Sequence, residues 1–442
     1  MCTRRITVLS AFVHAFRTPD LRKKILFVLF VIVLFRLGST MPAPGINVGN
    51  VRDAVQAAST GENSSLFALI NVFSGGALLQ LTVFALGIMP YITASIILQL
   101  LVVVIPRLEA LKKEGQAGQT KITQYTRYLT LGLAILQATG IVALARSGNL
   151  FGGAEQGRPL LYNPDSILSF LLIVLTMVAG TAVIMWLGEL ITDRGVGNGM
   201  SILIFTQVVA TFPGAMWQIK QTKGWTTFVG VIIIGLIIVA AVIFIEQAQR
   251  RIPVQYAKRM VGRRMFGGSS TYIPLKVNQA GIIPVIFASS LMYLPALMAQ
   301  FNSGAPWATW INDNFVKGDH PLYMATFFLL IVFFTYFYVS ITFNPEEVAD
   351  NMKKYGGFIP GIRAGRPTQD YLGYVLSRIT APGALYLGLI ALIPMIAIAL
   401  IGASQNFPFG GTTLLIIVGV GLDTVKQIES QLQQRNYEGF LK

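Results

Sequence analysis

The chain has 442 residues, of which 54% are hydrophobic and 12% are charged, whereas a soluble globular chain carries about 25% charged residues. This composition excludes an ordinary soluble protein and predicts helices that cross a membrane several times, with the net charge of +15 mainly in cytoplasmic loops. The single cysteine, Cys2, excludes a disulfide within the chain and a cysteine-rich metal site, and we expect no cofactor.

The first predicted element is a transmembrane span. Six basic residues between positions 4 and 24 precede an apolar run that begins at Ile25 and continues to about Met41. No small-residue cleavage site follows this run, so we expect an uncleaved span that enters the membrane from a cytoplasmic tail at residues 1–24.

The next stretch, 66–101, contains no charged residue but carries several residues that interrupt helices. Asn71, Ser74, Gly75 and Gly76 lie in its first half, and Pro90 lies late in it. Because Gly and Pro are the weakest helix formers, we expect a half-helix over 66–73, a Gly-rich break, and a full segment ending near residue 105. Irregular backbone at membrane depth occurs only where it is buried in protein or lines an aqueous cavity. The stretch therefore indicates a pore or binding site, while two ordinary segments joined at a kink remain the simpler alternative.

Eight further apolar segments follow, and they bring the number of predicted spans to about ten. They cover residues 123–145, 167–187, 199–212, 226–245, 280–301, 322–343, 382–402 and 412–427. Lys and Arg concentrate in alternate loops, and the positive-inside rule then places both termini in the cytoplasm.

The predicted fold class is an all-α polytopic membrane protein with two inverted halves of five spans around a central pore. The first half covers residues 25–213, including the half-helix and break at 66–76, and the second half covers 214–427. Because five is odd, the second half starts on the opposite side of the membrane from the first, as in an inverted repeat with a site between its halves. Two long cytoplasmic loops, 249–277 and 344–380, belong to the second half, and residues 428–442 form a cytoplasmic tail.

The sequence contains no catalytic constellation, so we do not expect an enzyme. Glu346 and Glu347 follow a proline, where acidic residues favour a helix start through the helix dipole. Glu189 and Glu246 stand at the cytoplasmic ends of spans, whereas an ion-coupled carrier usually needs an ionisable group within the membrane. A small-solute carrier and an intramembrane enzyme are therefore the weaker alternatives.

Several motifs are similar to those of the bacterial SecY family, which forms the channel of the protein-secretion translocon. The resemblance runs from about residue 16 to 440. Two departures are Ala364, where the family usually has proline, and Met200, where isoleucine is common. The motifs are FRLGSTMPAPGI (35–46), NVFSGGAL (71–78), ALGIMPYITASIILQLL (85–101), ITDRGVGNGMSILIF (191–205), PLKVNQAGIIPVIFASS (274–290) and PGIRAGRPT (360–368).

The resemblance implies a plug and an apolar pore ring. The plug would block the resting channel and would consist of Phe67, Ala68, Leu69, Ile70, Asn71, Phe73, Ser74, Gly75 and Gly76. The ring would exclude ions and water by dewetting. From the residue types alone, ordinary helix packing is the preferred explanation for the ring positions, which are Ile88, Ile92, Met200, Ile204, Ile286 and Ile416.

The resemblance also implies a lateral gate, through which segments leave sideways into lipid. Its two helices would correspond to 91–105 and 280–301, and polar groups near the seam could pair across it or be satisfied within their own helices. The implied gate residues are Tyr91, Ser95, Gln99, Asn278, Gln279 and Ser289.

The two long cytoplasmic loops carry clustered basic residues, with a hairpin tip expected at Gly267-Gly268. Such surfaces suit ribosomal RNA phosphates or an acidic protein. The family's loops dock the ribosome and the SecA motor, and its channel works with SecE-like and SecG-like subunits in the bacterial plasma membrane on signal sequences and unfolded polypeptides. The implied docking residues are Arg259, Arg263, Arg264, Lys353, Lys354, Arg363 and Arg366.

Overall fold

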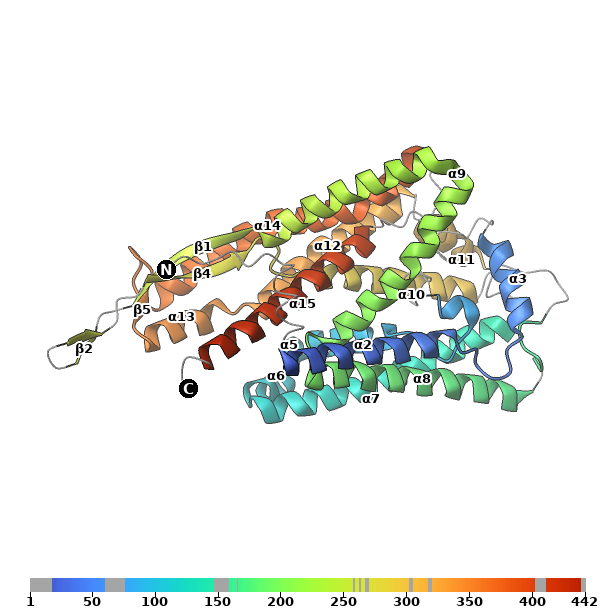
Figure 1. Cartoon of the computed structure of the whole chain (residues 1–442), viewed down its shortest axis with the longest axis horizontal. Coiled ribbons are helices and arrows are strands. Elements are labelled where there is room, and N and C mark those ends of the chain that lie inside the picture. Colours follow the sequence, from blue (N-terminus) through green and yellow to red (C-terminus); the bar gives the residue numbers. More distant parts are fainter. Residues whose placement is uncertain are drawn as a thin grey trace.

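A computed structural model of the chain describes residues 18–59, 76–146, 159–164, 166–256, 259–261, 264–266, 270–301, 305–316, 320–401 and 411–438. The described chain is mainly helical, as predicted, and Figure 1 shows long helices running side by side with a small sheet at one end. α7 (Gln116–Arg146) and α8 (Ile167–Arg194) lie on one side of this view, and α12 (Pro321–Thr342) and α14 (Arg366–Ile401) lie on the other. α9 (Gly199–Gln247) passes from the first group to the second.

The helices cover the predicted spans, but some run well beyond them: the helix predicted over 382–402 begins at residue 366, and the one predicted over 412–427 continues to residue 438. In the first half they are α2 (Pro19–Thr40), α3 (Val48–Ser59), the 3-10 helix η1 (Leu78–Gln80), α5 (Met89–Val104), α6 (Pro106–Lys113), α7 (Gln116–Arg146) and α8 (Ile167–Arg194). α9 (Gly199–Gln247) joins the two halves. The later helices are α10 (Ile283–Phe301), α11 (Pro306–Ile311), the π-helix η2 (Asn312–Val316), α12 (Pro321–Thr342), α13 (Pro345–Lys354), α14 (Arg366–Ile401) and α15 (Gly411–Glu438). The strands are β1 (Gln249–Tyr256), β2 (Arg259–Val261), β3 (Arg264–Phe266), β4 (Ser270–Lys276) and β5 (Gly357–Phe358).

Five of the described helical segments are long and apolar enough to cross a membrane, and a sixth is added if the bent pair α5 and α6 counts as one span. The remaining predicted spans also fall on helices, namely α2, the first part of α9, α10 and α15. The count of about ten spans thus stays a prediction, and the described helices are consistent with it. The five segments are Gln116–Arg146, Ile167–Arg194, Gly224–Gln247, Pro321–Lys354 and Arg366–Ile393.

α9 contains two of the predicted segments, 199–212 and 226–245, and the chain bends between them (Figure 1). Asn198 caps its start, because its side-chain oxygen accepts a hydrogen bond from the Met200 N–H at 3.0 Å. Gly224 interrupts the helix with φ 79°, a backbone conformation that favours glycine. The two segments therefore point in different directions although no loop separates them.

The helix start predicted around Glu346 is confirmed. α13 begins at Pro345, and the side-chain oxygen of Asn344 accepts a hydrogen bond from the Glu346 N–H at 3.1 Å. Glu346 and Glu347 occupy the first turn, where they favour the helix dipole.

The segment between the Gly-rich break and α5 differs from the prediction. We expected a full helix soon after Gly76, but residues 76–88 form turns and η1, and α5 begins only at Met89. Pro90 lies in the first turn of the helix, and Gly87 before the helix has φ 57°. The turns are fixed by the chain that follows α2, since the N–H groups of Ala43 and Val83 donate to the carbonyls of Leu81 and Met41 at 3.1 and 2.9 Å.

Two helix glycines allow this segment to pack closely. A Cβ on Gly180 of α8 would overlap the Val83 carbonyl oxygen, and a Cβ on Gly38 of α2 would overlap the ring of Phe84. Residues 82–84 are therefore held between α2 and α8, only a few residues before Ile88.

The two long loops of the second half form one small sheet, which the sequence did not predict. β1 follows α9 directly and pairs antiparallel with both β4 and β5, in the order β4-β1-β5. A buried cluster under this sheet includes Ile252, Leu275, Met352 and Leu372, which come from β1, β4, α13 and α14. Loops 249–277 and 344–380 therefore form a single body at one end of the molecule (Figure 1).

The hairpin in the first of these loops also differs from the prediction. β2 and β3 pair antiparallel with Val261 opposite Arg264, so these two strands are connected through residues 262 and 263. The expected tip, Gly267-Gly268, follows β3 and lies outside the described residues. Figure 1 shows β2 projecting away from the helices.

The hydrophobic core is divided in the same way as the helices. One buried cluster joins α3, α7 and α8 and includes Ala138 and Met177, and a second joins α10, α12 and α14 and includes Phe327 and Leu387. A third cluster contains residues from both halves of the chain, from Val31 of α2 to Ile416 of α15. The two halves meet in this third cluster, and Ile96 of α5 also joins the second cluster.

Candidate functional site

The six predicted ring residues all belong to the cluster where the two halves meet. Ile88, Ile204, Ile286 and Ile416 are buried, while Ile92 and Met200 are partly buried and pack against the same cluster. They come from the end of the segment 76–88, from α5, α9 and α10, and from α15. The structure thus brings together apolar side chains that are more than three hundred residues apart in sequence.

A cavity of about 420 Å³ lies beside this cluster, and Ile92, Met200, Ile204 and Ile286 form part of its wall. Tyr91, Ser95 and Gln99 of α5 also line it. α10 contributes the apolar residues Ile283 and Phe287, and Ile282 precedes that helix. The cavity is therefore bordered by the two helices that were expected to form the gate.

The other predicted gate residues form local contacts. Ser289 of α10 donates to the carbonyls of Val285 and Ile286 in its own helix, both at 2.9 Å. The side-chain oxygen of Gln279 accepts from the Lys276 N–H at 3.2 Å. For Ser289 the alternative of satisfaction within its own helix is the one observed, and Gln279 shows no pairing across the seam among the described residues.

Asn278 is also used elsewhere than expected. Its amide donates to a carboxylate oxygen of Glu246 at 2.6 Å and to the Gly281 carbonyl at 3.0 Å, so it binds the end of α9 and not α5. Both Asn278 and Glu246 are buried, and the Asn278 Oδ1 has no hydrogen-bond partner among the described residues. This contact ties the end of α9 to the start of α10. Sequence reasoning missed it because the partners are 32 residues apart.

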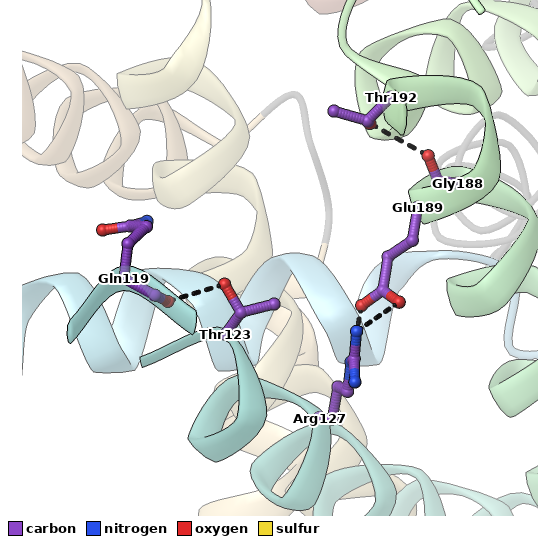
Figure 2. Close-up of polar contacts among 6 residues, drawn as sticks. All are labelled: Gln119, Thr123, Arg127, Gly188, Glu189 and Thr192. Atoms are coloured by element: carbon purple, nitrogen blue, oxygen red, sulfur yellow. Dashed lines mark hydrogen bonds and ion pairs between the residues drawn. The ribbon is translucent and has the colours of Figure 1, made fainter. Parts of the chain in front are cut away.

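An ion pair on the cavity wall was likewise not predicted. Figure 2 shows Arg127 of α7 facing Glu189 of α8, and the guanidinium donates two hydrogen bonds to the carboxylate at 2.8 and 2.7 Å. Both residues line the cavity, and the pair is partly exposed, so a contribution of roughly 1 kcal/mol or less to stability is expected. The signal in the sequence was an Arg and a Glu at the cytoplasmic ends of consecutive predicted spans.

Of the predicted plug, Gly76 alone lies within the described residues. It has φ 86°, in the region that favours glycine. The other plug residues, Phe67, Ala68, Leu69, Ile70, Asn71, Phe73, Ser74 and Gly75, lie outside the described residues.

The predicted docking cations lie in and around the small sheet. Arg259 and Arg264 belong to β2 and β3, and Arg263 lies outside the described residues. Lys353 and Lys354 are exposed at the last turn of α13, and Arg366 is exposed at the start of α14.

Arg363 lies in the turn before α14 and is exposed. Gly361 and Gly365 on either side have φ 84° and 105°, and the Arg363 carbonyl accepts from the Thr368 hydroxyl at 2.8 Å. Among the described residues, the Arg363 guanidinium has no hydrogen-bond partner, so the turn holds the backbone and leaves the side chain outward.

A helical membrane protein whose two halves meet at an apolar constriction, with a cavity beside it, belongs to the class of channels. The family model named SecY matches residues 82–425 of this chain. The protein translocase subunit SecY of Streptomyces galbus is 69% identical over 441 residues, which covers 98% of this chain and 100% of that protein. The chain therefore belongs to the SecY family.

Solved structures agree on the fold. One, described as a protein-conducting channel, has a TM-score of 0.63 and 19% identity, and covers 92% of this chain and 91% of its own. Another is Sec61 in the canine ribosome–channel complex from the endoplasmic reticulum, with a TM-score of 0.58, 18% identity and the same coverage. The all-α fold class is confirmed, and so is the expectation of a channel subunit that is not an enzyme.

Proposed function

We propose that this chain is the channel-forming subunit of a Sec-type protein translocase. It passes unfolded polypeptides across the membrane and releases transmembrane segments sideways into lipid. The observation that carries this proposal is the assembly of Ile88, Ile92, Met200, Ile204, Ile286 and Ile416 into one apolar cluster from both halves of the chain. A ring of this kind excludes water when empty and adapts around a passing chain.

The cavity beside the ring is where a signal sequence would enter. Its α10 side is apolar and suits the hydrophobic run of a signal sequence, whereas its α5 side offers Tyr91, Ser95 and Gln99. An arriving apolar helix would replace contacts between α5 and α10 and so part the gate. The chain transports and does not catalyse, so the energy comes from a bound partner.

We place the chain in the bacterial plasma membrane with both termini and the small sheet in the cytoplasm. Support comes from the basic residues of the sheet and of the loop before α14, because such an excess stays on the cytoplasmic side. This surface docks the ribosome and a SecA-type motor, and the channel works with SecE-like and SecG-like subunits. Sec61, which has the same fold, is found in the canine ribosome–channel complex, and this supports the ribosome as one partner.

The first test is removal of the plug. Deleting residues 67–73 is expected to raise the resting ion conductance of the purified channel in planar bilayers and to preserve motor-driven translocation in vesicles. The reason is that the short apolar segment before Gly75-Gly76 blocks the pore and takes no part in moving the chain. A resting conductance unchanged by the deletion, measured beside the intact chain, would overturn the plug assignment.

The second test separates the two cytoplasmic partners. Arg263→Glu combined with Arg264→Glu is expected to weaken ribosome binding strongly and to lower the slope of its salt dependence by about two, because each lost phosphate contact lowers that slope by about one. Arg363→Lys keeps the charge, so ribosome binding is expected to stay nearly intact. Motor-driven export should fall, because lysine cannot form the bidentate contact with a carboxylate that arginine forms.

A third measurement on the same preparations makes the result decisive. If Arg363 only stabilised its own turn, Arg363→Lys would lower the melting temperature together with both partner activities. Because the Arg363 guanidinium is exposed, we expect the melting temperature of Arg363→Lys to equal that of the parent. Equal loss of ribosome binding and export in this variant would contradict the assignment to the motor.

A further inference from the structure

Lys220 of α9 lies between two tryptophans. Its Nζ is 4.5 Å from the centroid of the Trp217 ring and 4.4 Å from that of Trp225. Both indoles are exposed, by 58% and 64%, and the Trp225 ring also meets Phe228 edge to face at 5.6 Å. Two large aromatic rings and a cation are thus presented together at the surface.

The cluster lies where α9 bends, at the end of the molecule opposite the sheet (Figure 1). Gly224 interrupts the helix between the two tryptophans and begins the candidate span Gly224–Gln247. Only 17% of the apolar window of this span is buried within the chain, against 28–50% for the other four, so most of its surface is left for lipid or a neighbouring subunit. The Trp–Lys–Trp cluster therefore lies at the level where the hydrocarbon of the bilayer ends.

The cluster carries a positive charge that no described carboxylate neutralises. Attraction to the ring faces stabilises a cation without removing its charge. No carboxylate of the described residues lies within ion-pair distance of the Lys220 ammonium, and neither indole N–H donates a hydrogen bond to a described residue. One ammonium and two free N–H donors are suited to an anion with several acceptor oxygens, and a phosphate diester is such an anion.

The surface next to the cluster is suited to acyl chains. Val229, Ile233 and Leu236 continue from Trp225 at helical spacing, and all three are exposed. Residues three or four apart lie on one face of a helix, so these side chains form an apolar stripe that runs from the cluster into the membrane. A polar head at the cluster and an apolar tail along the stripe together describe a phospholipid and exclude a soluble phosphate or a polar peptide.

We propose that Trp217, Lys220 and Trp225 bind the headgroup of an anionic phospholipid in the leaflet opposite the sheet. Trp and Lys are the residues that fix helices at a membrane interface. The bound lipid holds the bend of α9 at that interface. α9 joins the two halves of the channel, so its bend is the hinge about which the halves would move. The lipid therefore also fixes the depth of this hinge in the membrane. This last consequence rests on the proposed function.

The test uses the fluorescence of these two tryptophans in the full chain reconstituted in nanodiscs. Trp186, Trp307 and Trp310 are replaced by phenylalanine, which leaves Trp217 and Trp225 as reporters. Brominated phosphatidylglycerol and brominated phosphatidylcholine are compared as quenchers at equal mole fraction. The quenching is expected to show a roughly five-fold higher affinity for phosphatidylglycerol than for phosphatidylcholine, because one lysine near an anionic surface contributes about that factor.

Three variants in the same background decide the result. Lys220→Gln is expected to abolish the preference for the anionic lipid, and Lys220→Arg to retain it. Arg146→Gln removes an exposed cation from the end of α7, which has no aromatic pair around it among the described residues, and should leave the preference unchanged. Equal quenching by both lipids in the parent, or equal loss in the Lys220→Gln and Arg146→Gln variants, overturns the proposal. Because the readout is lipid binding, its failure is distinct from failure of the proposed translocation.

Discussion

Replacing Ile416 by asparagine is expected to admit water to the constriction and to let the channel export substrates with defective signal sequences. Ile416 is almost completely buried in the cluster that contains all six ring residues. An amide without hydrogen-bond partners there costs about 1–3 kcal/mol in the closed state, and hydration removes that cost once the channel opens. The open state should therefore gain roughly 5–150-fold in population. Export of a defective-signal reporter and resting ion conductance are the measurements.

Two companion variants show whether the ring position is responsible. Ile92→Asn, in the partly buried wall of the cavity, should act in the same direction but less strongly, because water already reaches that side chain. Ile416→Leu conserves volume and polarity and should behave like the parent. If Ile416→Asn exports the reporter no better than Ile416→Leu, the ring is misplaced.

The second large effect is expected at Gly180. Gly180→Ala places a methyl group against the Val83 carbonyl oxygen, and that backbone is held by its hydrogen bond to Met41. Overpacking of this kind costs typically about 1–3 kcal/mol and more where backbone must move. We expect a lower melting temperature of the purified protein and, because residues 82–84 lead into Ile88, a leaking resting channel.

Gly132→Ala is the matched control, since a Cβ at that helical glycine of α7 meets nothing within 4 Å. There the exchange should raise stability by about 0.5–1 kcal/mol through the helix preference of alanine. A melting temperature of Gly180→Ala equal to or above that of Gly132→Ala would show that the segment 82–84 is not held by α8.

The helices could be predicted because their signal is local. Long apolar segments and breakers such as Pro90 are read directly from the chain, and every predicted span falls on a helix. The late start of α5 could not be predicted, because the turns before it are held by hydrogen bonds that Ala43 donates to Leu81 and that Met41 accepts from Val83. Those contacts join residues about forty positions apart, and no periodicity reports them.

The ring and the gate also depend on contacts between distant residues, which the local sequence does not report. The identity of the ring residues came from the resemblance to a family, since isoleucine and methionine in a helix usually indicate only packing. Asn278 was placed at the gate by its position in a motif, but its partner is Glu246 at the end of the preceding helix. Polar contacts of this kind depend on how two elements pack, so residue types and spacing alone do not give the partner.

The central position of β1 has a consequence for the order in which the protein is made. One edge of β1 is covered by β4 soon after synthesis, whereas on the other edge Gln255 and Tyr256 pair with β5, which emerges roughly 100 residues later. At about 5–20 residues per second, that edge stays open for roughly 5–20 s. An unpaired strand edge is a template for pairing with other chains. During synthesis this edge of β1 is therefore exposed until α12, α13 and then β5 have left the ribosome.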